Sequence, residues 1–235
     1  MTAPLYLWPK SAEVGRIVPK QKFYEHTKIS TATKQKFIDD VQQIVWAFKL
    51  AEETVGLRGT EEVPEIQIFS IQAKGDDISN LVLATIDRAI PLPIIFEVHR
   101  HSARQKQLRV TAAHKPVGRA KPKPAAYFTS GWLPAGNDRK PLPPGIDLPR
   151  LYGQLLSPLL PTPVKPEEGL EKAIVRSDEI RRLERETSRL EVKMKNEPQF
   201  NRKVELRREL KILAAQLTAL AETTPSEPEK AAWRN

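Results

Sequence analysis

Two segments with a heptad-like seam, joined at a single proline, constrain this chain more than any other feature. Within each segment the seam positions are spaced alternately three and four residues apart. They are Ile180, Leu183, Thr187, Leu190 and Met194 in the first, and Leu206, Leu210, Leu213, Leu217 and Leu220 in the second. Pro198 lies between them, and proline cannot continue a helix because its ring clashes with the preceding turn. The pattern therefore predicts an antiparallel helical hairpin over residues 166–222.

Such a hairpin is a device for assembly rather than for chemistry. Two helices alone bury little apolar surface, so we expect part of the seam to bind a protein partner. The residues expected at that contact are Leu183, Leu190, Leu206, Leu213 and Leu217. Residues 166–222 contain 13 basic and 12 acidic side chains. This near-balance favours solvent-facing ion pairs over a dedicated DNA-binding region.

Residues 1–133 are expected to form an α+β domain. Ser30 or Thr31 can cap a helix, whose apolar stripe would be Phe37, Val41, Ile44, Val45 and Phe48. Strands are predicted over residues 65–74, 93–99, 108–113 and 126–132, and a helix capped by Asp76 or Asp77 over 77–90. A crossover through that helix would make its two flanking strands parallel neighbours. The predicted fold class is thus α+β, a small mixed sheet with flanking helices followed by the coiled-coil-like hairpin.

The remaining segments are expected to form a connector and a C-terminal tail. Five prolines between residues 134 and 149 predict a connector over 134–165, interrupted by a short helix near 148–160. Residues 223–235 are polar, and we expect a disordered tail. The chain has no cysteine, no signal-peptide pattern at its start and no apolar run near the roughly 18 residues of a membrane span. We therefore expect a soluble, cytoplasmic protein without a membrane partner.

The net charge of +9 is concentrated in one stretch. Residues 98–150 contain 11 Lys and Arg against only Asp138 and Asp147. Clustered basic side chains suit phosphate, because each neutralised phosphate releases counterions. The residues expected to bind nucleic acid are Arg100, Arg104, Lys106, Arg109, Lys115, Arg119, Lys121 and Lys123, with Tyr127 or Phe128 as stacking partners. A solvated loop, with the aromatic rings in the core, is the alternative.

No pattern in the chain predicts an established active site. Gly56 to Thr60 lacks the lysine of a phosphate-binding loop, and no Gly-x-Ser-x-Gly elbow occurs. We therefore expect no catalytic residue, bound metal or cofactor. One alternative is a divergent metal-dependent nuclease using Glu65, Gln72 and Lys74, because such centres pair carboxylates with a lysine near a strand end.

A second alternative is a divalent metal site. Glu97 and His99 share one strand face, and His101 and His114 follow in the sequence. The spacing matches no established ligand pattern, so an ion pair between this strand end and a nearby arginine is favoured.

Three stretches resemble an uncharacterised bacterial and archaeal family known as domain of unknown function 4391. They are Val18-Pro19-Lys20 with Ile44-Val45-Trp46, residues 88–96, and residues 196–206. These motifs are structural, so the resemblance implies no catalytic residue. Relatives tend to be encoded near helicases, DNA methyltransferases and restriction-type genes. The resemblance therefore implies an accessory role in genome defence, as an adaptor for a helicase- or methyltransferase-type partner, by association only.

Overall fold

The computed structural model describes residues 3–25, 29–102, 105–113, 127–162, 164 and 168–221. The chain divides into two compact units, Met1–Pro161 and Thr162–Asn235. Residues 134–161, expected as part of a connector, belong to the first unit. The second unit is the predicted hairpin.

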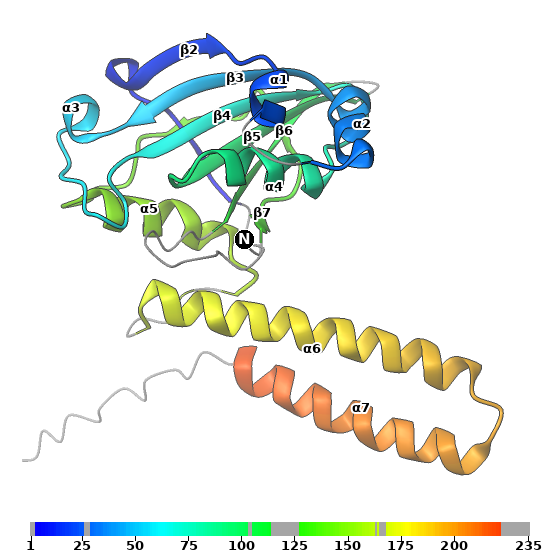
Figure 1. Ribbon diagram of the computed structural model, residues 1–235. Helices are drawn as coiled ribbons and strands as arrows, with labels where there is room; N and C mark the ends of the chain where they lie inside the picture. The colour runs from blue at the N-terminus through cyan, green and yellow to red at the C-terminus, as the bar shows by residue number, and fades with distance from the viewer. Residues whose placement is uncertain are drawn as a thin grey trace, which may run out of the picture. The chain divides into compact units, whose positions relative to one another are not determined.

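A seven-stranded mixed sheet organises the first unit (Figure 1). Its order is β2-β3-β4-β5-β6-β7, with β8 also paired to β6. The strands are β2 (Glu13–Ile17), β3 (Val41–Leu50), β4 (Ile66–Ala73), β5 (Ile94–Ser102), β6 (Gln105–Ala113), β7 (Tyr127–Thr129) and β8 (Leu133–Pro134). Among the strand pairs described in this sheet, only β4 and β5 run parallel, through the crossover helix α4 (Asn80–Ala89), as predicted. The later strands pair antiparallel, which is also as predicted.

Helices cover both faces of this sheet. On one face, α1 (Gln21–Glu25), α2 (Thr31–Asp40) and α4 pack over a core that contains Phe37, Phe96 and Val98. On the other face lie α5 (Leu148–Leu156), η2 (Ser157–Leu159) and a two-stranded sheet of β1 (Leu5–Tyr6) with β9 (Arg139–Lys140). Two short helices, η1 (Lys10–Ala12) and α3 (Glu52–Val55), complete the unit.

Two local predictions in this unit were wrong. The stripe from Phe37 to Phe48 was expected to be one helix, but α2 ends at Asp40 and β3 begins at Val41. The residues from Val41 onward are rich in β-branched and aromatic side chains, and β3 pairs with both β2 and β4, so tertiary pairing overrides the helical period. Ser30 does cap α2, accepting from Thr33 N at 3.1 Å. The cap of α4 is Ser79, not Asp76 or Asp77.

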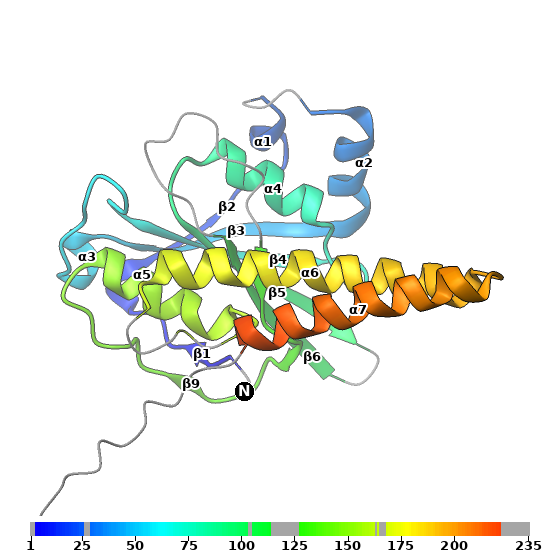
Figure 2. The same cartoon turned by 90° about the horizontal axis from the view of Figure 1, so that it is seen from below.

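The second unit is a pair of antiparallel helices, α6 (Leu170–Asn196) and α7 (Phe200–Ala221), that lie side by side in both views (Figures 1 and 2). Pro198 lies between them, as predicted. Arg176, near the start of α6, donates to the carbonyl oxygen of Leu220 at 3.4 Å, which confirms the antiparallel arrangement. The same guanidinium pairs with Glu168 at 2.7 Å and donates to Thr162 at 2.7 Å, so it fixes the open end of the hairpin.

Candidate functional site

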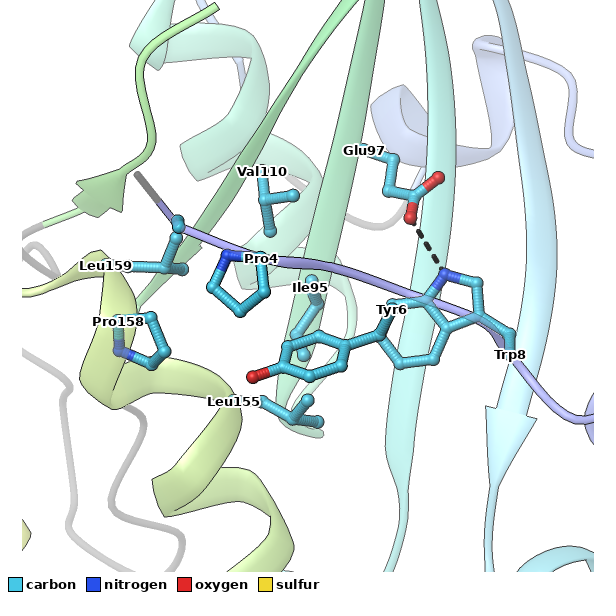
Figure 3. Close-up of a pocket in the computed structure, with 10 residues that line it drawn as sticks. Pro4, Tyr6, Trp8, Ile95, Glu97, Val110, Leu155, Pro158 and Leu159 are labelled. Carbon is cyan, nitrogen blue, oxygen red and sulfur yellow. Dashed lines mark hydrogen bonds between the residues drawn. The ribbon is translucent and has the colours of Figure 1, made fainter. Parts of the chain in front are cut away.

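A buried polar cluster of the first unit is centred on the carboxylate of Glu97, in the middle of β5. Arg139 of β9 forms two hydrogen bonds to it, at 2.7 and 2.9 Å. Trp8 donates its indole N–H to the same carboxylate at 2.8 Å (Figure 3). The Glu97 side chain is only 8% exposed. The expected ion pair between this strand and an arginine is therefore present, and it ties the N-terminal segment and β9 to the sheet.

His99 extends this cluster along the same face of β5. Its Nε2 lies 3.8 Å from Glu97 Oε2. Burial lowers the pKa of His99 and the Arg139 charge lowers it further, while the Glu97 carboxylate opposes both. The cavity beside the cluster measures about 10 Å³ (Figure 3). That is about the volume needed for one water molecule, so a substrate has no room there.

The metal-site alternative is not supported by this geometry. Glu97 already accepts three hydrogen bonds, from Trp8 and Arg139. His101 Nδ1 lies 3.3 Å from the side-chain amide of Gln72. No group of three or more His, Asp or Glu side chains suited to a metal occurs among the residues described, and His114 lies outside them.

The three residues of the nuclease alternative are not brought together. Glu65 precedes β4, where it lies 3.4 Å from Lys49. Lys74 follows the far end of β4 and donates to the carbonyl oxygen of Ile38 at 2.6 Å. An eight-residue strand spans about 26 Å, so Glu65 and Lys74 act in different places.

Lys74 has a structural role that the sequence did not reveal. It caps the last turn of α2 together with Lys20, which donates to the carbonyl oxygens of Phe37 and Val41. Cations are favourable at helix C-termini because they meet unpaired carbonyls and the negative end of the helix dipole. Burial lowers the pKa of Lys20, and the neighbouring Lys74 charge adds to that effect. Lys20 also borders an open groove of about 780 Å³, lined by residues of α2, β2 and β3 and their connections.

Two of the expected nucleic-acid residues form a stack around Trp132. The guanidinium of Arg100 lies 3.9 Å from the Trp132 ring centroid and that of Arg109 lies 5.3 Å away. Arg109 pairs with Asp77 at 2.7 Å, and its side chain is 11% exposed. Arg100 donates to the carbonyl oxygen of Asp76 at 2.9 Å. Both arginines therefore hold the segment before α4 against the sheet, by cation–π contact and hydrogen bonding.

The remaining expected nucleic-acid residues divide into one that is described and five that are not. Lys106 on β6 is exposed. Outside the described residues lie Arg104, Lys115, Arg119, Lys121 and Lys123. Phe128 is fully buried and Tyr127 packs against the core, so the expected stacking of bases on Phe128 was wrong. Burial and the neighbouring Asp87 carboxylate raise the pKa of Tyr127.

The leucines at the predicted seam positions are buried or half-buried in the structure. Leu183 and Leu206 are buried, at 3% and 4% exposure. Leu190, Leu213 and Leu217 are half-buried. The first two thus stabilise the hairpin itself, whereas the other three keep apolar surface exposed along the seam.

Sequence reasoning missed Trp8 and Arg139 as partners of Glu97, and it did not pair Trp132 with Arg100 and Arg109. Their partners lie 89 residues away for Trp8 and 42 for Arg139, and no local spacing signals contacts of that kind. Trp132 comes after the basic stretch in the sequence, whereas Arg100 and Arg109, which contact its ring, lie earlier on the separate strands β5 and β6.

Within the part of the chain that the structure describes, no helix has the length and apolar character needed to cross a membrane. Comparison with curated proteins and with solved structures gives no match. Residues 7–217, most of the chain, match the family described as domain of unknown function DUF4391. With its seven-stranded sheet, its Pro198 turn and all of its hairpin up to residue 217 inside the matched range, this chain belongs to that family.

Proposed function

We propose that this protein is a non-enzymatic, cytoplasmic adaptor subunit of a bacterial DNA-processing or anti-phage defence system. Its hairpin would bind a helicase- or methyltransferase-type partner. The observation that carries the proposal is the hairpin itself, a separate compact unit with an incompletely covered seam. The link to DNA processing rests on the genes that tend to accompany relatives of this family.

The seam is suited to accept a further helix. Leu190, Leu213 and Leu217 remain half-buried although α6 and α7 are already paired. In helical bundles such positions are covered by knobs from an additional helix. A partner helix laid along the seam would bury this apolar surface, and each added methylene would contribute about 0.8 kcal/mol.

The absence of cysteine allows a sharp test. A single cysteine introduced by Leu213→Cys, carrying a photo-crosslinker, should capture the partner when the full chain is expressed with candidate helicases and methyltransferases. The matched control is Ala215→Cys, at an exposed position two residues after Leu213 on the same helix. Capture from position 213 and not from 215 would support the seam contact. A monomer that captures no candidate from either position would argue strongly against an adaptor.

The competing hypothesis, a divergent metal-dependent nuclease, makes a different prediction for Lys74. It requires Mg²⁺-dependent cleavage of DNA or RNA that Lys74→Ala abolishes while the fold is retained. The helix-capping contact of Lys74 instead leads us to expect no cleavage in the wild-type chain and a small loss of stability in the variant, about 1 kcal/mol. Metal-dependent cleavage lost in Lys74→Ala would replace the adaptor proposal.

A further inference from the structure

The charges of the hairpin are unevenly distributed along its length. The distal end, residues 189–208 around Pro198, contains seven basic side chains against three acidic ones. The rest of the described hairpin, residues 168–188 and 209–221, has six basic against seven acidic. The basic residues of the distal end are Arg189, Lys193, Lys195, Arg202, Lys203, Arg207 and Arg208, and the acidic ones are Glu191, Glu197 and Glu205. The near-balance of the whole hairpin therefore conceals a basic distal end.

These basic side chains are exposed and mostly unpaired. All seven are exposed, and Arg202 forms an ion pair with Glu197 at 3.7 Å. The other six form no ion pair within the described chain. Elsewhere in the hairpin, by contrast, Arg176 and Arg182 pair with carboxylates at 2.7 and 2.5 Å. The distal end thus presents a net positive charge, and six of its seven cationic groups form no ion pair with a described carboxylate.

An exposed aromatic ring accompanies this charge. Phe200, the first residue of α7, is 78% exposed at the turn of the hairpin. The other large apolar side chain strongly exposed in this end is Val192, at 61%. Protein–protein contacts need an apolar core, and two separate side chains do not form one. Phosphate binding needs no such core, and single-stranded bases stack on individual exposed rings.

We propose that the distal end of the hairpin binds single-stranded nucleic acid. Its lysines and arginines would neutralise backbone phosphates, and one base would stack on Phe200. This contact is separate from the basic stretch of the first unit. It uses other side chains than the seam leucines assigned to a protein partner, of which Leu190 and Leu206 lie in the same stretch of the chain. The proposed nucleic-acid contact goes beyond the adaptor proposal, and it can be tested with this chain alone, in the absence of a partner protein.

The test uses the full chain and a fluorescently labelled 20-nucleotide DNA of mixed sequence, single-stranded or as a duplex. Binding is followed by anisotropy over a range of salt concentrations. The triple variant Lys193→Glu/Lys203→Glu/Arg207→Glu should weaken binding at least tenfold at low salt. The slope of log affinity against log salt should fall by about 2, because each phosphate neutralised on a single strand contributes about 0.7. Phe200→Ala should weaken single-strand binding roughly tenfold and leave duplex binding nearly unchanged.

A matched control places the same charge change outside the distal end. Lys172→Glu/Arg185→Glu/Lys211→Glu alters three exposed basic residues of the hairpin, and circular dichroism checks that both triple variants keep their helix content. The proposal would be overturned if both triple variants weakened DNA binding equally, or if the wild-type chain did not bind DNA at low salt. It would also be overturned by a distal variant that binds DNA normally but no longer captures the protein partner, since the surface would then recognise an acidic protein.

Discussion

Glu97 and Arg139 form the ion pair on which the N-terminal segment depends. Removing one partner of a buried pair leaves the other charge uncompensated, which is costly. The Arg139 side chain is 26% exposed, so water offsets part of that cost. We expect Arg139→Ala to lower the free energy of unfolding by about 2–3 kcal/mol, measured by urea denaturation.

A double-mutant cycle separates the pair from the bulk of the two side chains. Glu97→Gln keeps an acceptor for the Trp8 indole, so it should cost less than Arg139→Ala. The two changes together should cost less than the sum of the single changes, because the second removes an already unpaired group. Strict additivity would mean that the pair contributes nothing.

His99 should make stability depend on pH near neutrality. Its pKa is lowered in the folded state, so between the folded and unfolded values the unfolded chain binds more protons. Stability is therefore fully present above the unfolded pKa, near 6.5, and falls as the pH drops below it. Thermal melts between pH 7.5 and about 5.5 should show a falling melting temperature, and His99→Gln should flatten that dependence. An unchanged slope in the variant would assign the effect to other groups.

At the level of elements, the hairpin shows how far a repeating pattern can be trusted. The spacing of seam residues predicted both helices and the turn at Pro198, because a heptad is a local signal repeated many times. Leu206 is buried at 4% exposure, whereas Leu213 is half-buried. We expect Leu206→Ala to cost about 2–3 kcal/mol and Leu213→Ala about 1 kcal/mol. Urea denaturation followed by helical circular dichroism measures both losses of stability. An equal loss in the two variants would mean that the seam is closed along its whole length.

The strand β3 shows where such a pattern fails. Residues 37–48 satisfy a helical stripe, yet Val41 to Leu50 pairs on both sides within the sheet. The β-branched and aromatic side chains of this segment favour a strand, but the hydrogen bonds that decide the outcome come from β2 and β4, which the local spacing does not show. An ion pair between Glu97 and an arginine was expected, but its donors Trp8 and Arg139 were unpredictable for the same reason, because they come from distant parts of the chain. The strand-favouring composition of residues 65–74 and 93–99 did predict β4 and β5, and the helix between them predicted their parallel pairing.

At the scale of the whole molecule, the charge excess of residues 98–150 has its own test. Arg100 contacts Trp132 and Arg109 pairs with Asp77. The expected contact with phosphate is therefore left to Lys106 and to the basic residues outside the described ranges. If that stretch binds phosphate, Arg119→Glu/Lys121→Glu/Lys123→Glu should weaken binding of all sequences alike. The salt slope should fall by about 2–3, from 0.7–0.9 for each phosphate contact. Affinity unchanged in this variant and reduced in the distal hairpin variant would place nucleic-acid binding on the hairpin alone.

The pairing of β1 with β9 has a consequence for the time at which this protein becomes complete. Arg139 also donates to the carbonyl oxygen of Tyr6, a partner 133 residues earlier. Ribosomes add about 5–20 residues per second, so the N-terminal segment waits on the order of ten seconds for its partner to be synthesised. Until then Trp8 and the carboxylate of Glu97 lack the contact that joins them to β9. During synthesis, therefore, residues 5–8 emerge well before β9 and are secured only after β9 has been made.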